Sequence, residues 1–125
     1  MPAMLVWLAA RLGSFRHALR GLYFLTQEPN ARIHLLVAVL VLAFSFWSGL
    51  SGHDLLWVLA AIFLVVITET INTALERLAD AAVPEWHPLV GKAKDLAAGA
   101  VLLSAIFAGL VAIFVLWPKL NLHLA

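Results

Sequence analysis

Polar side chains recur at helical spacing between residues 66 and 82, inside an otherwise apolar stretch. They are Glu69, Asn72, Thr73, Glu76 and Asp80. On an α-helix these five positions project within an arc of roughly 100°. A carboxylate facing lipid at mid-helix costs on the order of 2.5 to 3.5 kcal/mol even on the mildest scale, so the stripe must face other helices, a cation or a wet cleft. A structural polar seam between helices is the alternative, but it needs only one or two such residues. The pattern therefore favours a functional site.

A second group of charged residues, Lys92, Lys94 and Asp95, directly precedes another apolar stretch. Anchoring on the positive inner side of a membrane explains Lys92 by itself, and Asp95 could be a helix N-cap. If the chain turns back after residue 82, Lys94 and Asp95 come near Glu76 and Asp80. A lysine beside carboxylates can bind a phosphate whose metal those carboxylates hold.

Glu28 stands alone, directly before Pro29. Proline is favoured in the first turn of a helix, and a carboxylate at a helix start is favoured by the macrodipole. Beside Glu76, Glu28 could instead supply a second oxygen ligand for Mg²⁺, which takes few protein carboxylates and completes its shell with phosphate and water.

The composition indicates what positions these residues. Of the 125 residues, 64% are hydrophobic and 12% are charged, and the mean hydropathy is +1.00. So few charges cannot coat a soluble domain of this length. Three apolar stretches are each near the roughly 20 residues that cross a bilayer core, and we expect spans at about 30–50, 55–82 and 95–117 within a single domain, 1–125. The net charge of +1 argues against nucleic acid as a partner, and the absence of cysteine excludes disulfides and thiolate sites.

Basic and aromatic residues predict the orientation. The stretch before Ile33, where the first apolar run begins, carries four arginines, whereas the link Ser51–Asp54 carries no Lys or Arg. The segment after the second apolar run, which ends at about Leu75, carries Arg77, Lys92 and Lys94, and Lys119 is the exception. Trp47, Trp57 and Trp117 then fall at the outer interface. Both signals predict a cytoplasmic N-terminus.

Two further elements are expected. An amphipathic surface helix at about 4–27 carries apolar residues on one face and Arg16 and Arg20 on another. The apolar face is Leu5, Leu8, Leu12, Phe15, Leu19 and Leu22. On the third span, Ser104, Ala108 and Ala112 lie four apart and permit close helix association. The expected fold is an all-α membrane protein with a surface helix and three transmembrane helices.

No phosphate-binding loop, dinucleotide fingerprint or soluble-kinase catalytic loop is present in the sequence. His34, His53 and His87 are too scattered to predict a metal site from spacing. An enzyme acting on nucleotides would therefore not use a soluble-kinase scaffold.

The segments 69–80 (ETINTALERLAD) and 91–100 (GKAKDLAAGA) resemble the two signatures of the small prokaryotic diacylglycerol kinase and undecaprenol kinase family. The segment 28–34 (EPNARIH) is similar to its N-terminal signature. The resemblance covers roughly residues 14 to 118. It implies a lipid kinase that uses ATP and Mg²⁺, assembled as a homotrimer with active sites shared between subunits. It also implies a multi-pass protein of the bacterial inner membrane, with its active site at the cytoplasmic face.

The resemblance assigns roles residue by residue. Glu69 matches the general base on the lipid hydroxyl, and Asn72 matches the partner beside it. Glu28 and Glu76 match the carboxylates that hold the metal on the nucleotide phosphates. Lys94 matches the phosphate-binding lysine, and Asp80 and Asp95 match acidic residues of the nucleotide site. The surface helix departs from the family pattern at His17 and between residues 21 and 28, so no nucleotide contact is carried over there.

The acceptor lipid is open between two alternatives. The stretches 30–34 and 87–89 look closer to the undecaprenol kinase branch, and diacylglycerol phosphorylation to phosphatidic acid is the alternative. A rival from another class is a non-enzymatic membrane subunit or proton-coupled carrier, with Glu69 as its proton site. A carrier usually needs more spans or an internal repeat, and the sequence contains neither.

Overall fold

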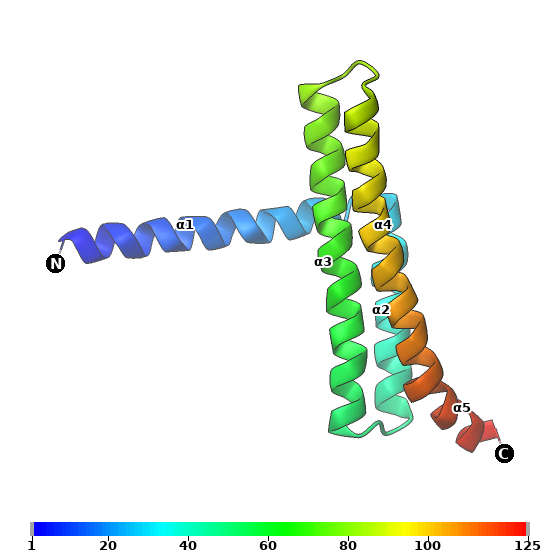
Figure 1. Cartoon of the computed structure of the whole chain (residues 1–125). Helices are drawn as coiled ribbons and strands as arrows, with labels where there is room; N and C mark the ends of the chain where they lie inside the picture. The colour runs from blue at the N-terminus through cyan, green and yellow to red at the C-terminus, as the bar shows by residue number, and fades with distance from the viewer. Residues whose placement is uncertain (1, 125) are drawn as a thin grey trace.

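The computed structural model describes residues 2–124, and these residues form helices with short links and no strand. The elements are α1 (Pro2–Leu25), α2 (Pro29–Trp47), α3 (Gly52–Ala82), α4 (Pro88–Val111), a π-helical segment η1 (Ala112–Leu116) and α5 (Trp117–Leu124) (Figure 1). Three helical segments, 29–47, 52–82 and 88–124, are long and apolar enough to cross a membrane. The predicted fold class, an N-terminal helix followed by three candidate spans, is confirmed.

The helix α1 leaves the bundle sideways and extends away from it (Figure 1). Its predicted apolar face is exposed, from Leu5 to Leu22, and the bundle buries Leu25 at the end of the helix. The helix stops at Leu25, slightly before the expected end at residue 27, because residues 26–28 form the turn into α2. An apolar face without protein cover is typical of a helix that lies on a membrane surface.

The central helix of the bundle is α3, which packs against both α2 and α4, whereas contacts between α2 and α4 are sparse. Val58, Ala61 and Val111 form the buried core. Higher up, the Thr68 and Ser104 hydroxyls share a hydrogen bond of 2.9 Å between α3 and α4. The small residues predicted on the third span therefore do permit close helix association, with Ser104 buried and Ala108 packed on the core.

A tight turn joins α2 to α3. Gly49 adopts a positive φ of 63°, and the Leu50 N–H donates to the Ser45 carbonyl at 3.1 Å. This is the usual glycine ending of a helix. The Ser51 hydroxyl then accepts from the Asp54 N–H at 3.1 Å and caps α3, which begins at Gly52, ahead of the expected span start at residue 55.

The fourth helix begins well before residue 95. His87 is its N-cap, with the imidazole Nδ1 accepting from the Leu89 N–H at 3.2 Å, and Pro88 takes the first helical position. Asp95 therefore lies inside α4, and the alternative that it caps a helix is wrong. Hydropathy marks where a helix enters a membrane, and α4 begins earlier, at Pro88, ahead of the charged segment 91–95.

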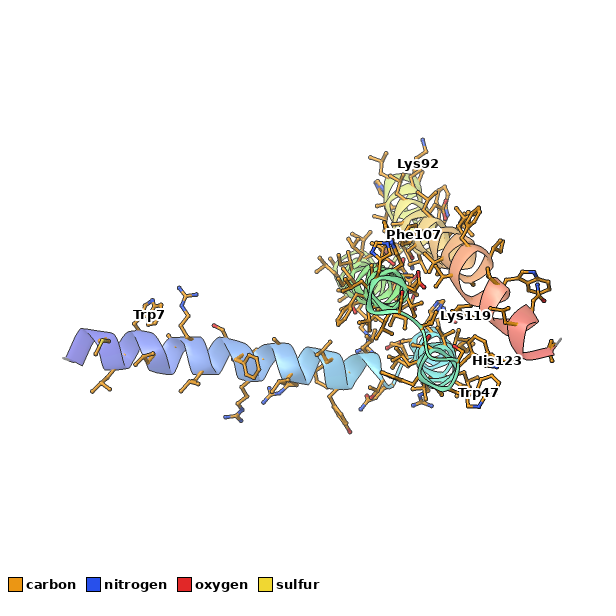
Figure 2. All side chains as sticks on the ribbon, turned by 90° about the horizontal axis from the view of Figure 1, so that it is seen from below. Trp7, Trp47, Lys92, Phe107, Lys119 and His123 are labelled. Atoms are coloured by element: carbon orange, nitrogen blue, oxygen red, sulfur yellow. The ribbon has the colours of Figure 1, made fainter. Side chains whose placement is uncertain are left out.

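The far end of the bundle carries three of the five tryptophans, whereas Trp7 lies in α1 and Trp86 in the α3–α4 link. Trp47, Trp57 and Trp117 are exposed there, and the Trp47 ring lies 4.6 Å from the His123 ring (Figure 2). The Trp117 N–H donates to the Ala112 carbonyl, five residues back, just before Pro118. Because proline lacks an N–H, the regular α-helical ladder is interrupted at this point.

Candidate functional site

The polar stripe of α3 changes from buried to exposed along the helix. Glu69 and Asn72 are buried, at 4% and 7% exposure, while Glu76 is half-buried and Asp80 is exposed. The stripe therefore faces the bundle at its deep end and reaches the surface near the α3–α4 link. This is the arrangement expected for a site that opens at one end of the bundle.

The buried end of the stripe lines a cavity of about 290 Å³ between the three long helices. Glu69 and Asn72 come from α3, and Asn30 and His34 come from α2. Ile33, Ala98 and Val101 complete the wall. The structure thus brings together the two residues predicted to be catalytic.

Asn72 links the cavity to the surface. Its Nδ2 donates to Glu76 Oε1 at 3.2 Å, whereas its Oδ1 is buried and has no hydrogen-bond partner among the described residues. A buried polar atom without a partner costs about 1 to 3 kcal/mol. An oxygen kept in this state next to Glu69 favours a ligand site over a structural seam.

Lys94 lies next to Asp80, as expected if the chain turns back after residue 82. Lys94 Nζ lies 2.9 Å from Asp80 Oδ1, because the link 83–87 returns α4 alongside the end of α3. Asp95 does not join them: it is exposed and follows Lys94 directly, so it projects about 100° away around α4. The structure therefore brings Lys94, but not Asp95, to the polar face of α3.

Glu28 and Glu76 have different partners. Glu28 is the N-cap of α2, yet its side chain makes no capping hydrogen bond and pairs instead with Arg77 of α3. In residues 2–124, no three His, Cys, Asp or Glu side chains gather closely enough to hold a metal alone. Glu76 Oε1 accepts from Asn72 Nδ2, so the two predicted metal ligands have separate partners, and no hydrogen bond or ion pair joins Glu28 to Glu76 among the described residues.

The end of α1 meets α3 partway along the site, between Glu69 and Asp80. A small cavity of about 190 Å³ lies between Gly21, Phe24 and Leu25 of α1 and the α3 segment 70–77. Glu69 lies on one side of this level, toward the middle of the bundle. Asp80 and the α3–α4 link lie on the other side.

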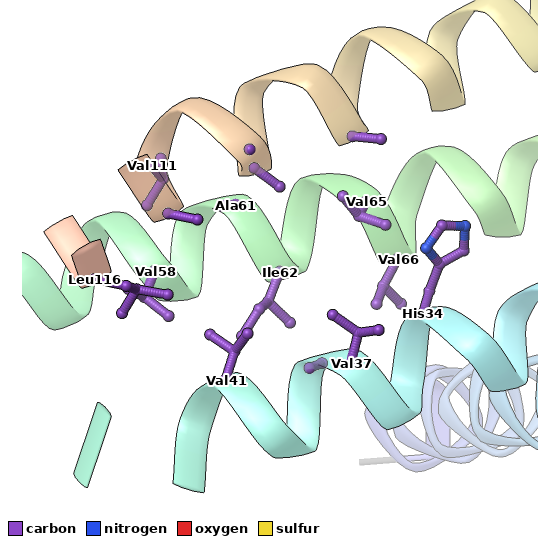
Figure 3. A pocket seen from close by; sticks show the side chains of 15 residues that line it. His34, Val37, Val41, Val58, Ala61, Ile62, Val65, Val66, Val111 and Leu116 are labelled. Atoms are coloured by element: carbon purple, nitrogen blue, oxygen red, sulfur yellow. The ribbon is translucent and has the colours of Figure 1, made fainter. Parts of the chain in front are cut away.

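Another cavity, of about 300 Å³, shares the wall residue His34 with the Glu69 cavity, and Figure 3 shows the side chains that line it. It occupies the gap between α2 and α4 over the face of α3, and its walls are Val, Ala, Ile, Leu and Gly except for His34. We call it the apolar groove. Small residues of the α4 segment, Ala105, Ala108 and Gly109, keep it open.

The Glu69 cavity and the apolar groove follow each other along one helical face, and together we call them the path. Positions 98, 101, 105, 108 and 112 line them in turn, and this spacing of three and four residues keeps them on one helix face. At about 1.5 Å per residue, the face is roughly 21 Å long. A chain-like apolar molecule with a polar end at Glu69 would match this path.

Sequence reasoning missed three residues near the site. Asn30 and His34 share the cavity with Glu69, and Arg77 pairs with Glu28. Spacing alone gave one usable signal, because Asn30 and His34 lie four apart and so share one face of a helix. Arg77 gave none, because its partner lies 49 positions away.

Comparison with known proteins agrees with this geometry. The family described as prokaryotic diacylglycerol kinase matches residues 16–116. The chain is 40% identical to a diacylglycerol kinase of Synechocystis over 87% of its own length, and that match covers 63% of the Synechocystis protein. It is 34% identical to an undecaprenol kinase of Bacillus subtilis, covering 86% of this chain and 88% of that protein. A diacylglycerol kinase of Escherichia coli is 29% identical over 73% of this chain and 75% of its own length.

Proposed function

Because the chain belongs to the prokaryotic diacylglycerol kinase family, a family of lipid kinases, we propose that it phosphorylates a membrane lipid alcohol with ATP. The lipid hydroxyl oxygen forms a bond to the γ-phosphorus, and the bond from that phosphorus to the β,γ-bridging oxygen breaks. ADP leaves, and the hydroxyl proton passes to the Glu69 carboxylate. The products are a lipid phosphate and ADP.

The observation that carries the proposal is a buried carboxylate in a cavity that shares a wall residue, His34, with an apolar groove. Glu69 lines the cavity with Asn72, and the apolar groove extends from it for the length of an aliphatic chain. A lipid alcohol has the same division between one hydroxyl and a long apolar part. Its hydroxyl would lie at Glu69, and its chain would lie in the apolar groove.

The nucleotide is proposed to bind where the stripe reaches the surface. Glu76 lies about 10 Å along the helix from Glu69, at a rise of roughly 1.5 Å per residue. Glu28 and Glu76 would hold Mg²⁺ on the phosphates, and the ion would neutralise phosphate charge. Lys94 would exchange its ion pair with Asp80 for a bond to a phosphate. Asp80, which is exposed, would then contact the nucleotide. Asp95 is proposed to contact the nucleotide from its own side of α4.

Undecaprenol is the acceptor that we propose, giving undecaprenyl phosphate. The relative named undecaprenol kinase is matched over 88% of its length, and the apolar groove offers no polar side chain beyond His34. Diacylglycerol is the second candidate, supported by the relative at 40% identity that is named a diacylglycerol kinase. That acceptor would give phosphatidic acid.

We also propose a homotrimer in the bacterial inner membrane, with the N-terminus and the site on the cytoplasmic side. The excess of Lys and Arg at the α1 and α3–α4 end supports this orientation. The separation of Asp95 from Lys94 around α4 supports a shared site, because a nucleotide contact from that face would suit a site completed by a neighbouring subunit.

Purified protein in phospholipid bilayers, supplied with Mg²⁺-ATP and a panel of lipid alcohols, tests the proposal. We expect lipid phosphate to form together with an equal amount of ADP. ATP hydrolysis without lipid phosphate, or no reaction with any alcohol, would contradict the kinase assignment and favour the carrier alternative.

A further inference from the structure

We propose that the end of the bundle opposite the α3–α4 link binds one anionic phospholipid, with its phosphate at Lys119 and an acyl chain in a cavity beside α5. This lipid belongs to the surrounding bilayer and is not the acceptor of the kinase reaction. The family match ends at residue 116, so Lys119 and His123 lie beyond the segment that the family model covers. The inference goes beyond the proposed function and does not depend on it.

The cavity that would hold the acyl chain lies between α2 and the segment 112–120, and we call it the α5 cavity. Its volume is about 300 Å³, and Phe44 forms its wall on the α2 side. The other lining residues are Ala112, Ile113, Leu116, Trp117 and Leu120. None of these side chains carries a charge, and the segment 112–120 spans roughly 12 Å at about 1.5 Å per residue. This lining and length fit part of an acyl chain.

The helix is irregular where α5 begins, because η1 is π-helical and Pro118 lacks an N–H. Figure 1 shows α5 slanting outward at this end of the bundle. It still contacts α2, since the ring centroids of His123 and Trp47 lie 4.6 Å apart. The centroids of Trp47 and Phe44 lie 5.8 Å apart. A series of three rings therefore leads from the wall of the α5 cavity to His123.

Lys119 provides the charge that would recognise the phosphate. It departs from the excess of basic residues at the other end of the bundle. His123 follows it by four positions, so both lie on one face of α5. Figure 2, which looks onto this end, shows Lys119, His123 and Trp47 grouped there. Both ion pairs in residues 2–124 lie at the other end, so neither Asp54 of α3 nor another described carboxylate pairs with Lys119.

The level of Lys119 in the membrane matches that of a lipid phosphate. Trp47 and Trp117 are exposed at this end, and indole rings prefer the headgroup region of a bilayer. From there, the α5 cavity extends back toward the middle of the bundle, as an acyl chain does from its headgroup. The His123 imidazole adds an N–H that can donate to a phosphate oxygen. A phospholipid matches both the polar and the apolar part of this surface.

Charge decides the class of headgroup. A lysine near the membrane surface attracts anionic lipids, by about five-fold for one cation. A zwitterionic headgroup would bring its own ammonium group near Lys119, and the repulsion between the two cations would oppose binding. Phosphatidylglycerol should therefore bind in preference to phosphatidylcholine.

The fluorescence of Trp117, which lines the α5 cavity, can report the bound lipid. The protein is prepared with Trp117 as its single tryptophan, the other four being replaced by Phe. It is placed in phosphatidylcholine vesicles that contain acyl-brominated phosphatidylglycerol or acyl-brominated phosphatidylcholine, because bromine quenches indole fluorescence on contact. A matched form that retains only Trp57, which is exposed at the same end but lies outside the α5 cavity, is the control.

We expect half-maximal quenching of Trp117 at a three- to ten-fold lower mole fraction of the brominated phosphatidylglycerol, and no such preference for Trp57. Lys119→Gln should abolish the preference, Lys119→Arg should retain it, and Lys92→Gln, at the other end of the bundle, should not change it. Thermal unfolding in detergent checks that each variant is folded. Lys119→Met, which retains an apolar stem without the charge, carries the test if Lys119→Gln is not folded.

Three results would overturn the inference. One is a Trp117 that both lipids quench equally, or a preference that persists in Lys119→Gln. Another is quenching that undecaprenol abolishes at equal mole fraction, which would assign the α5 cavity to the acceptor chain, because Ala112 and Leu116 also line the apolar groove. The third is a Trp117 that neither lipid quenches, which would indicate that a second copy of the chain covers the cavity. The quenching is measured without ATP, so a failure of the proposed kinase function would leave these results unchanged.

Discussion

Glu28 and Arg77 form an ion pair that joins the start of α2 to the polar end of α3. The Arg77 side chain is 59% exposed and that of Glu28 is 26% exposed. Pairs this accessible are worth only about 0.2 to 1 kcal/mol. The Glu28 carboxylate is therefore held against α3 by the Arg77 guanidinium. Because this ion pair is weak, another cation can readily replace the guanidinium.

This relationship predicts opposite effects of the two partners on the Mg²⁺ requirement. Glu28→Ala and Glu76→Ala should each raise the half-saturating Mg²⁺ concentration, because each removes an oxygen ligand. Arg77→Ala should lower it by about two- to five-fold, because it removes a competing cation of modest strength. Lipid phosphate formation against free Mg²⁺ at fixed ATP gives the values. Lys92→Ala is the control for losing one positive charge at the same end of the bundle.

An unchanged Mg²⁺ dependence for both glutamate variants would remove the carboxylate pair from the proposal. A change for Glu76→Ala alone would return Glu28 to a role at the helix start. A higher requirement for Arg77→Ala would mean that the arginine positions Glu28 for the metal and does not compete with it.

Glu69→Gln should reduce turnover by about 10² to 10⁴-fold while leaving nucleotide affinity unchanged. The amide cannot accept the hydroxyl proton, and a general base contributes about this much. Turnover and equilibrium ATP binding are measured on the same preparation. Asp54→Asn, at the start of the same helix, is the control and should retain turnover. Wild-type turnover in Glu69→Gln would make Glu69 a structural residue of the helix interface.

Much of this site could be predicted from helical periodicity. Glu69 and Asn72 fall on one face of α3, which must be buried because lipid disfavours carboxylates, and both are buried. The pairing of Lys94 with Asp80 required only that the chain turn back after residue 82. These inferences use contacts within one helix or across one short link.

The residues that were missed depend on packing between distant segments. His34 is a single histidine in an apolar helix, and only the gap between α2 and α4 gives it a place at the mouth of the apolar groove. The start of α4 at Pro88 was also missed, because the charged segment 91–95 marks a membrane boundary and not a helix boundary. The exposed position of Asp95 follows from that earlier start.

Lys94→Gln should raise the KM for Mg²⁺-ATP by about 10- to 100-fold, as expected for loss of a hydrogen bond to a charged group. Lys94→Arg should retain part of the affinity, because the charge remains. Lys92→Gln, two positions earlier and exposed, is the matched control. An ATP KM that stays at the wild-type value in Lys94→Gln would leave Lys94 as a structural partner of Asp80.

Ala105→Phe should obstruct the apolar groove and raise the KM for undecaprenol by about ten-fold, the scale of a changed apolar pocket. Ala105 lines the apolar groove, whereas Leu103 on the same helix is 70% exposed and lies outside it. Leu103→Phe is therefore the control for added bulk. Equal effects of the two substitutions would indicate that the lipid chain does not lie in the apolar groove.

Undecaprenol should be phosphorylated with a higher kcat/KM than a long-chain diacylglycerol. Both lipids present one hydroxyl near the membrane surface, so discrimination must come from the path beside Glu69. Its apolar groove offers one polar side chain, His34, whereas a diacylglycerol would bring two ester groups toward it. Ester groups without a hydrogen-bond partner would disfavour diacylglycerol and so favour the polyprenol. Apolar pockets discriminate by only about 1 to 3 kcal/mol, so measurable activity on both lipids is expected. The two must be compared in one bilayer at equal mole fraction, because partitioning into detergent micelles can reverse the order. A preference for diacylglycerol under those conditions would reverse the acceptor assignment, and the kinase assignment would stand.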